Sequence, residues 1–330
     1  MKVQQIIGVD LSKRTIDLVC HSLGTHIKIE NSISGFQQFT RWLKNHKINS
    51  SEVMVVMEHT GLYSLQFENF LQKHQFGFTK VSALAIKRSL GLIRGKTDKI
   101  DAFRIAAYGY EKMERLTVDL PVSQNLKRLQ MLHATRDRLV KQRAALVCAI
   151  KEYRHIGLSE KDVLVQSQLR IIKTYDQEIK RLEREAEKLI NADEKLRKNY
   201  DLLRTIKGVG NVLALATIIK TNNFQKFANS RKFACFCGTA PFEHSSGTSI
   251  KGKARVSHLA DKQMKSLLDL SAKTAIQHDP ELRNYYLNRI EKGKSKMSSI
   301  NIVRNKIVYR MFAVIKRQTP FIENYNYQAA

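Results

Sequence analysis

Short apolar runs dominate the N-terminal part of the chain and predict a small sheet. Three of them predict strands in quick succession, at 5–12, 15–22 and 27–31. We expect Ser34 to cap the following helix, which carries Phe36, Phe39 and Trp42 on one face. The uninterrupted apolar run at 53–57 is typical of a strand covered on both faces, and a helix over 62–74 and a strand over 76–81 come next. The expected order is three strands, helix, strand, helix, strand and then helices.

Long helices replace this pattern between about 122 and 200, where Gly and Pro are almost absent. A first helix carries Leu132, Leu139 and Leu146 at heptad spacing. After a break at 155–157, a second run alternates steps of three and four residues: Ile172, Tyr175, Ile179, Leu182, Ala186 and Leu189. This spacing predicts a helical hairpin or coiled coil that pairs with itself or with another protomer.

The remaining chain is typical of a mainly helical domain. Residues 202–219 predict a helix, a tight turn at Gly208 to Gly210 and an apolar helix, which is the pattern of a helix-hairpin-helix. A plain turn between two packed helices is the alternative. Further on, HSSGTS predicts a polar turn before an amphipathic helix. A helix around Tyr285, a basic loop and a last helix complete the chain.

Four carboxylates lie at the ends or starts of the predicted strands and helices. Asp10 ends the first apolar run, Glu58 ends the run at 53–57, and Asp98 and Asp101 share one face of a helix. This element order resembles the ribonuclease H-like fold, whose catalytic carboxylates occupy these places. Together the four side chains would supply oxygen ligands for two Mg²⁺ ions and so favour phosphodiester exchange. The alternative for each is local: a strand-end turn for Asp10, a helix cap for Glu58, and an N-cap and first-turn residue for Asp98 and Asp101. We interpret Asp17, Glu30 and Glu68 as surface charges.

The net charge of the chain indicates which kind of molecule it binds. Lys and Arg outnumber Asp and Glu by 57 to 30, which gives a formal net charge of +27 and favours nucleic acid. A basic membrane-surface protein is the alternative, but the excess spans the whole chain rather than one amphipathic helix. Three clusters are expected to contact phosphates, with a solvated surface as the alternative: Lys87, Arg88, Arg94 and Lys96; Lys207 with Gly208 and Gly210; and Lys251, Lys253 and Arg255. Basic residues on the first long helix, such as Arg136 and Arg143, are candidates of the same kind.

The composition of the chain indicates its cellular compartment. Apolar runs are too short for a transmembrane helix, and the polar start is not typical of a signal peptide. Four cysteines without a CxxC spacing are typical of reduced thiols rather than a zinc site. We therefore expect a cytoplasmic, nucleoid-associated protein of a prokaryote.

These motifs together resemble the insertion-sequence 110 family of DEDD-type transposases, which also includes the pilin-gene DNA invertase. The resemblance covers nearly the full length and rests on GVDLSK, MEHTGLY, GKTDKIDA, IKGVG and CGTAPFEHSSGTSIKGKARVSHLADKQMKSLL. It implies three parts: a RuvC-like metal-binding domain over 1–120, a coiled-coil oligomerisation segment over 121–200, and a C-terminal transposase domain over 201–330. The fold class it implies is α/β plus α.

The resemblance also implies a mechanism. Asp10, Glu58, Asp98 and Asp101 would bind Mg²⁺ or Mn²⁺. Ser246, with the adjacent Ser245 as the alternative, would attack a phosphodiester of donor or target DNA and form a covalent phosphoserine link. Members of the family form a composite site between protomers and are guided by a structured non-coding RNA, which pairs with both DNAs.

Two other classes of protein share part of this pattern. A RuvC-like structure-specific nuclease would use the same carboxylates without a serine nucleophile and without a covalent intermediate. An inactive nucleic-acid-binding module derived from an insertion sequence would need only the basic surface. Retention of all four carboxylates favours an enzyme over the binding module.

Overall fold

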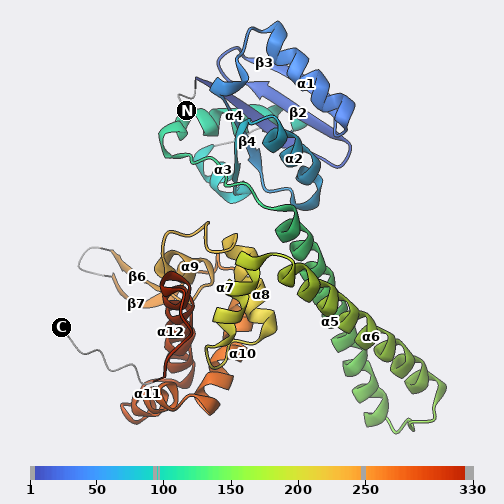
Figure 1. The fold of residues 1–330 in the computed structure, drawn as a ribbon, viewed down its shortest axis with the longest axis vertical. Helices are drawn as coiled ribbons and strands as arrows, with labels where there is room; N and C mark the ends of the chain where they lie inside the picture. The colour runs from blue at the N-terminus through green and yellow to red at the C-terminus, as the bar shows by residue number, and fades with distance from the viewer. Residues whose placement is uncertain (1–3, 92–94, 96, 247–249, 324–330) are drawn as a thin grey trace. The chain divides into compact units, whose positions relative to one another are not determined.

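The computed structural model describes residues 4–91, 95, 97–246 and 250–323, and it leaves out the side chains of 244–246, 250, 251 and 253. The chain divides into two compact units, Met1–Pro121 and Val122–Ala330. Each unit has its own arrangement of helices and strands (Figure 1). None of the helices in the described residues is long and apolar enough to cross a membrane.

The first unit is built on a five-stranded mixed sheet in the order β3-β2-β1-β4-β5. Its strands are β1 (Gln5–Leu11), β2 (Thr15–Cys20), β3 (Thr25–Glu30), β4 (Val53–Glu58) and β5 (Gly77–Val81). The first three pair antiparallel, whereas β4 pairs parallel with β1 and with β5. Strand β4, which lies between β1 and β5, is buried from Val53 through Met57, as its continuous apolar sequence predicted. The predicted order of elements is confirmed.

Helices cover both faces of this sheet. On one face, α1 (Ile33–Asn45) and α2 (Leu65–Lys73) pack an aromatic core against the odd-numbered residues of β1. On the other face, α3 (Ala83–Ser89) and α4 (Asp98–Glu111) pack against Ile6, Val56 and their neighbours. The cap of α1 is Ser32, whose Oγ accepts a hydrogen bond from the Gly35 backbone N–H. The prediction of Ser34 was wrong by two residues, because either serine suits a helix start and only the backbone path selects one.

The second unit begins with a helical hairpin. Its helices α5 (Gln124–His155) and α6 (Val163–Asn191) run antiparallel, because Arg136 pairs with Glu183 at 2.7 Å and Arg143 with Asp176 at 2.6 Å. Ile172, Ile179 and Ala186 of the predicted apolar seam are buried. The basic residues Arg136 and Arg143 therefore hold the hairpin together. The sequence had left them as candidate nucleic-acid contacts.

The rest of this unit packs short helices around a second core. These helices are α7 (Glu194–Arg204), α8 (Asn211–Thr221), α9 (Ser230–Phe236), α10 (Lys262–His278), α11 (Pro280–Glu291) and α12 (Lys296–Arg317). The antiparallel strands β6 (Pro241–Ser246) and β7 (Ile250–Val256) were not predicted. Their sequences are rich in Ser, Gly and Lys, which favours the prediction of a turn. Cross-strand pairing stabilises the two strands although their intrinsic strand propensity is low. Residues 247–249 lie outside the described part.

Candidate functional site

Two of the predicted site residues come from neighbouring strands. Asp10 lies near the end of β1 and Glu58 ends β4, and these parallel strands are in register up to the pair Val9 and Met57. Both carboxylates are half-buried at one edge of the sheet. Glu58 caps no helix, since the next helical turn begins at Gly61 and follows Thr60.

The other two residues come from the first turn of α4. Thr97 caps this helix by accepting a hydrogen bond from the Ile100 backbone N–H at 3.2 Å, so the alternative interpretation of Asp98 as the N-cap is wrong. Helix α4 lies very close to β1 because Gly8 has no side chain. A Cβ on Gly8 would lie 2.3 Å from the Ala106 backbone nitrogen. Asp10 shares this face of β1 with Gly8, so close packing brings α4 toward Asp10.

The four carboxylates interact electrostatically. The pKa of Asp10 is raised from 3.8 to about 6, first by burial and then by the negative charges of Asp98, Asp101, Asp17 and Glu58. Asp10 therefore sits in an anionic environment that favours a cation. The donor set consists of carboxylate oxygens, which are the ligands that hard divalent cations prefer.

The side chains of the described residues do not form a closed metal cluster: no three His, Cys, Asp or Glu among them are grouped as metal ligands. Instead, Asp101 pairs with Arg104 at 2.8 Å, and Asp98 pairs with Lys28 at 3.7 Å. Asp98 keeps 63% of its side chain exposed. Mutually repelling carboxylates turn toward nearby cations, and exposed first-turn side chains can change rotamer at small cost.

A fifth carboxylate at this site was missed from the sequence. Asp17 of β2 pairs in register with Asp10 of β1 and with Lys28 of β3, so the three residues form one row across the sheet. Asp17 is buried and contacts His26 at 2.8 Å and Lys28 at 3.3 Å. Its interpretation as a surface charge was wrong. The signal available in the sequence was the alternation around residue 17, which places it on the same face as Asp10 once the register is known.

Glu68 was also misread as a surface charge. It is buried on α2, where it accepts hydrogen bonds from Ser64 Oγ at 2.6 Å and Lys80 Nζ at 2.7 Å. This network joins α2 to β5 and belongs to the framework rather than to the site. Its charged partner Lys80 lies on another element, twelve residues further along the chain, so no local pattern could reveal the burial.

The predicted phosphate-contacting residues have different surroundings. Lys87 and Arg88 are exposed in the last turn of α3. Arg94 and Lys96 lie outside the described residues. Lys207 pairs with Glu323 at 2.8 Å. Gly208 adopts a φ of +90° and packs against the Ser271 carbonyl of α10, so a packing role accounts for this glycine. Gly210 is open and precedes α8 without a side-chain cap.

The serine segment is described only in its backbone. Ser245 and Ser246 end β6, opposite Lys251 and Ile250 of β7, and their side chains lie outside the described part, as do those of Lys251 and Lys253. Arg255, further along β7, is exposed. The assignment of the nucleophile therefore stays a prediction.

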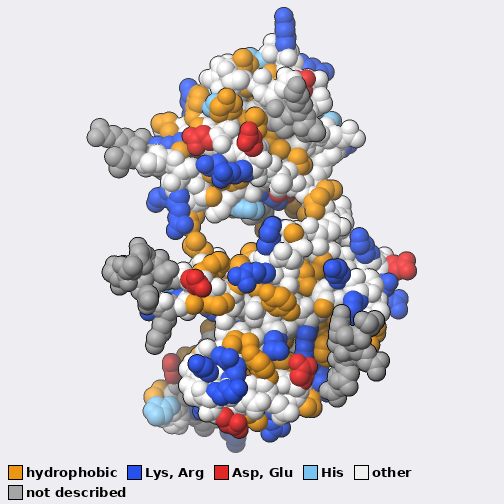
Figure 2. Space-filling model, turned by 90° about the vertical axis from the view of Figure 1, so that its left-hand side faces the viewer, with side chains coloured by type: hydrophobic (Ala, Val, Ile, Leu, Met, Phe, Trp, Pro, Cys, Tyr) orange, Lys and Arg blue, Asp and Glu red, His pale blue; other side chains and the backbone are white. Residues whose placement is uncertain are grey.

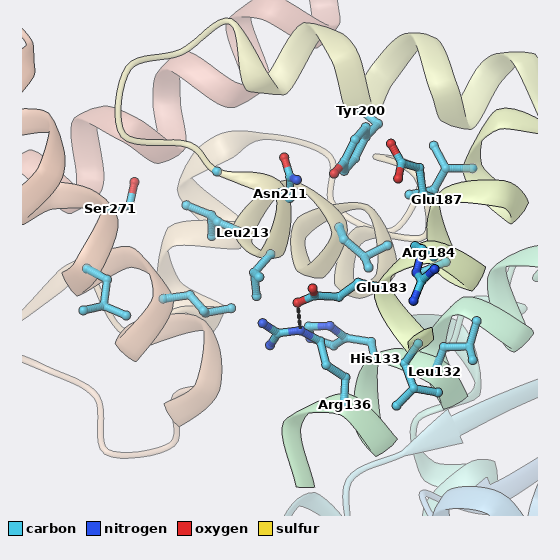
Figure 3. Close-up of a pocket in the computed structure, with 18 of the residues that line it drawn as sticks. Leu132, His133, Arg136, Glu183, Arg184, Glu187, Tyr200, Asn211, Leu213 and Ser271 are labelled. Atoms are coloured by element: carbon cyan, nitrogen blue, oxygen red, sulfur yellow. Dashed lines mark hydrogen bonds and ion pairs between the residues drawn. The ribbon is translucent and has the colours of Figure 1, made fainter. Parts of the chain in front are cut away.

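A cavity of about 730 Å³ lies in the second unit between α5, α6, the Gly208–Gly210 turn and α10 (Figure 3). Its wall is mostly apolar, and His133 and Ser271 line it with buried polar atoms that have no hydrogen-bond partner in the described residues. Burial lowers the pKa of His133. None of the four predicted catalytic carboxylates, all of them described residues, lines this cavity. Lys and Arg side chains are also spread over the visible face of both units (Figure 2).

A mixed sheet with acidic residues supplied by β1, β4 and the first turn of α4 is consistent with the ribonuclease H-like domain of a DEDD-type transposase. Comparison with known proteins agrees with this class. A model of the IS110 DEDD transposase domain matches residues 7–153, and a model of the transposase IS116/IS110/IS902 family matches residues 200–287. A DEDD transposase domain implies dependence on a divalent metal ion and DNA as partner.

Relatives cover nearly the whole chain. The pilin gene-inverting proteins of Moraxella bovis and Moraxella lacunata are each 27% identical over 328 residues, 96% of this chain and 97% of theirs. The uncharacterized 43.6 kDa protein of insertion element IS110 from Streptomyces coelicolor is 27% identical over 118 residues, 36% of this chain and 29% of its own. The chain belongs to the IS110 family of transposases and is a DNA transposase or recombinase.

Proposed function

We propose that this transposase cuts and rejoins DNA for an insertion sequence at a site where Asp10, Glu58, Asp98 and Asp101 hold Mg²⁺ or Mn²⁺. The observation that carries the proposal is geometric: Asp10 and Glu58 lie at the ends of adjacent parallel strands, and α4, with Asp98 and Asp101 in its first turn, packs directly against β1 at Gly8. The raised pKa of Asp10 agrees with this, because burial and the charges of the other three residues contribute to it. When bound, the metal supplies positive charge to the phosphodiester and to its leaving oxygen.

The framework divides these ligands into fixed and adjustable ones. Asp10 and Glu58 are held by adjacent strands of a buried sheet, so their backbone positions are rigid. Asp98 and Asp101 lie in the first turn of a helix and are held by Lys28 and Arg104. Asp98 and Asp101 would have to leave these cations in order to hold a metal ion together with Asp10 and Glu58.

The proposed nucleophile is Ser246, with Ser245 as the alternative. Its Oγ would form a bond to phosphorus while the bond from phosphorus to the leaving strand breaks. The serine proton would pass to a base at the site, and the leaving oxygen would take up a proton. One phosphate ester replaces another, so the covalent link between serine and DNA conserves the energy of the phosphodiester bond for rejoining the strands. Carboxylates and serine belong to different compact units, so the reaction needs the two units to meet, within one chain or between chains.

Two partners complete the proposal. The net charge of +27 is compatible with a structured guide RNA in addition to donor and target DNA. A homo-oligomer is supported by apolar residues at the tip of the α5–α6 hairpin, where Ile156 is 72% exposed and Val163 is 77% exposed. The heptad seam itself is already buried within the hairpin, so we propose that another protomer packs on the exposed apolar residues of this tip.

A trapping assay tests the chemistry. The protein, the RNA flanking the element and labelled target DNA are incubated with Mg²⁺ and run on a denaturing gel, for the wild type and for Ser246→Ala, Ser245→Ala and Asp10→Ala. We expect a labelled protein band that is lost in Ser246→Ala and Asp10→Ala but persists in Ser245→Ala, the matched control. Cleavage without a covalent band, surviving in both serine variants, would identify a metal-dependent nuclease instead.

A further inference from the structure

A second surface of the first unit has the chemistry of a binding site. Helices α1 and α2 enclose a groove of about 840 Å³, here called the α1–α2 groove, which is lined by residues of both helices and by His74 just after α2. The helices cover the sheet face that carries the odd-numbered residues of β1 (Figure 1). Asp10 belongs to the other face, beside α4. The groove is therefore separate from the carboxylate site.

The Lys and Arg side chains that line the groove give it a positive charge. Arg41 and Lys44 from α1 and Lys73 from α2 line it, and all three are exposed. The lining includes no Asp or Glu. Within the described residues these three cations have no ion-pair partner. The acidic residue of α2, Glu68, is buried and already paired with Lys80. Unpaired cations on both sides of a groove attract a polyanion that lies between them.

The floor of the groove adds aromatic surface. Phe70 lines it and is partly buried, and the exposed ring of His74 packs 4.4 Å from the Phe70 ring, centroid to centroid. Ile33 stands at the rim with 75% of its surface exposed. A positively charged groove with aromatic side chains is the arrangement that binds single-stranded nucleic acid, because phosphates meet the cations and unstacked bases meet the rings.

The aromatic side chains of the groove distinguish a single strand from a duplex, because they stack on bases that are not already stacked in a helix. A duplex keeps its base faces in the stack and would leave the aromatic floor without a partner. We propose that the α1–α2 groove binds single-stranded DNA, holding an unpaired strand of the DNA while the carboxylate site on the opposite face acts. This inference extends the proposed function, but strand binding is measured without any cleavage, so the two fail separately.

The test is an anisotropy titration of a labelled oligothymidylate with the full-length chain over a series of salt concentrations. The variant is R41Q/K44Q/K73Q, and the matched control is R170Q/K173Q/K198Q, which removes one Arg and two Lys that are exposed on α6 and α7. Three lost phosphate contacts should lower the slope of log K against log salt by about 2, since each contributes about 0.7 on single strands. The control should leave the slope unchanged.

Two further measurements keep the proposal falsifiable. His74→Ala should weaken binding several-fold without changing the salt slope, because it removes a stacking ring and leaves the three Lys and Arg cations in place. Fluorescence of Trp42, a buried residue of α1, reports whether each variant of this unit is folded. The proposal is overturned if groove and control variants lose the same slope. It is also overturned if the groove variant weakens duplex DNA or single-stranded RNA as much as, or more than, single-stranded DNA.

Discussion

Removing the charge of Asp10 should stabilise the metal-free protein while it destroys the site. In the folded chain the pKa of Asp10 is about 6, against an ordinary value of 3.8. Because the folded state binds this proton more tightly than the unfolded state, ionisation of Asp10 opposes folding. The penalty is fully present above pH 6 and disappears as the pH falls below 3.8. Asp10→Asn keeps the shape of the side chain and removes the penalty at neutral pH.

The magnitude follows from the two pKa values. Their difference, 6 minus 3.8, is about 2.2, which corresponds to about 3 kcal/mol at about 1.4 kcal/mol for each tenfold change. Asp10 is only half-buried, so solvent screening reduces this figure. We therefore expect Asp10→Asn to raise the free energy of unfolding by about 1–2 kcal/mol at pH 7.5 in the presence of a chelator, and by less than half of that at pH 4.5.

The chain provides its own probe for the assay. Its single tryptophan, Trp42, is 8% exposed in the first unit, so urea unfolding followed by tryptophan fluorescence reports on that unit alone. Glu30→Gln, at an exposed position on β3, is the matched control and should change the free energy by less than about 0.5 kcal/mol. If Asp10→Asn destabilises the unit at pH 7.5, or stabilises it equally at both pH values, then Asp10 does not lie in an anionic environment and the reasoning fails.

Three further substitutions test the framework. Gly8→Ala places a Cβ 2.3 Å from the Ala106 nitrogen, so it should lower the free energy of unfolding by more than about 2 kcal/mol in the Trp42 assay. It should also reduce Mn²⁺ binding measured by electron paramagnetic resonance. Retained binding would show that α4 need not lie so close to β1. Glu68→Gln leaves Lys80 without its charged partner and should cost about 2–4 kcal/mol in the same assay; a change no larger than that of Glu30→Gln would refute the role of this pair. Gly208→Ala should lower the melting temperature followed by circular dichroism, because φ is +90° and the Ser271 carbonyl blocks the Cβ, whereas Gly210→Ala, with open space, should not. Equal melting temperatures would contradict this account of the turn.

The sheet was predictable because most of its strands carry short apolar runs between clear breaks. The order of elements, the burial of β4 and the placing of Asp10 and Glu58 near strand ends follow from that pattern. The pair β6 and β7 was not predictable, because local sequence rich in Ser, Gly and Lys favours a turn and only cross-strand pairing defines the strands. Boundaries such as the cap at Ser32 depend on backbone geometry within one or two residues.

Buried charges were the least predictable part of the site. Asp17 and Glu68 look like surface residues in sequence, but each is buried beside a cation from another element, Lys28 in one case and Lys80 in the other. Asp17 also contacts the ring of His26. Such partners are set by register and packing. The same holds for Lys28 and Arg104, which contact the predicted ligands Asp98 and Asp101 and which no motif singled out.

Direct binding of Mn²⁺ to the full-length chain tests the central claim, that four carboxylates from β1, β4 and α4 form one metal site. The titration is followed by electron paramagnetic resonance for the wild type, for Asp10→Asn, Glu58→Gln, Asp98→Asn and Asp101→Asn, and for the control Glu30→Gln. We predict that each of the four substitutions weakens binding at least about tenfold and that the control does not. Wild-type affinity in all four variants would contradict the account, because the metal would then be held elsewhere.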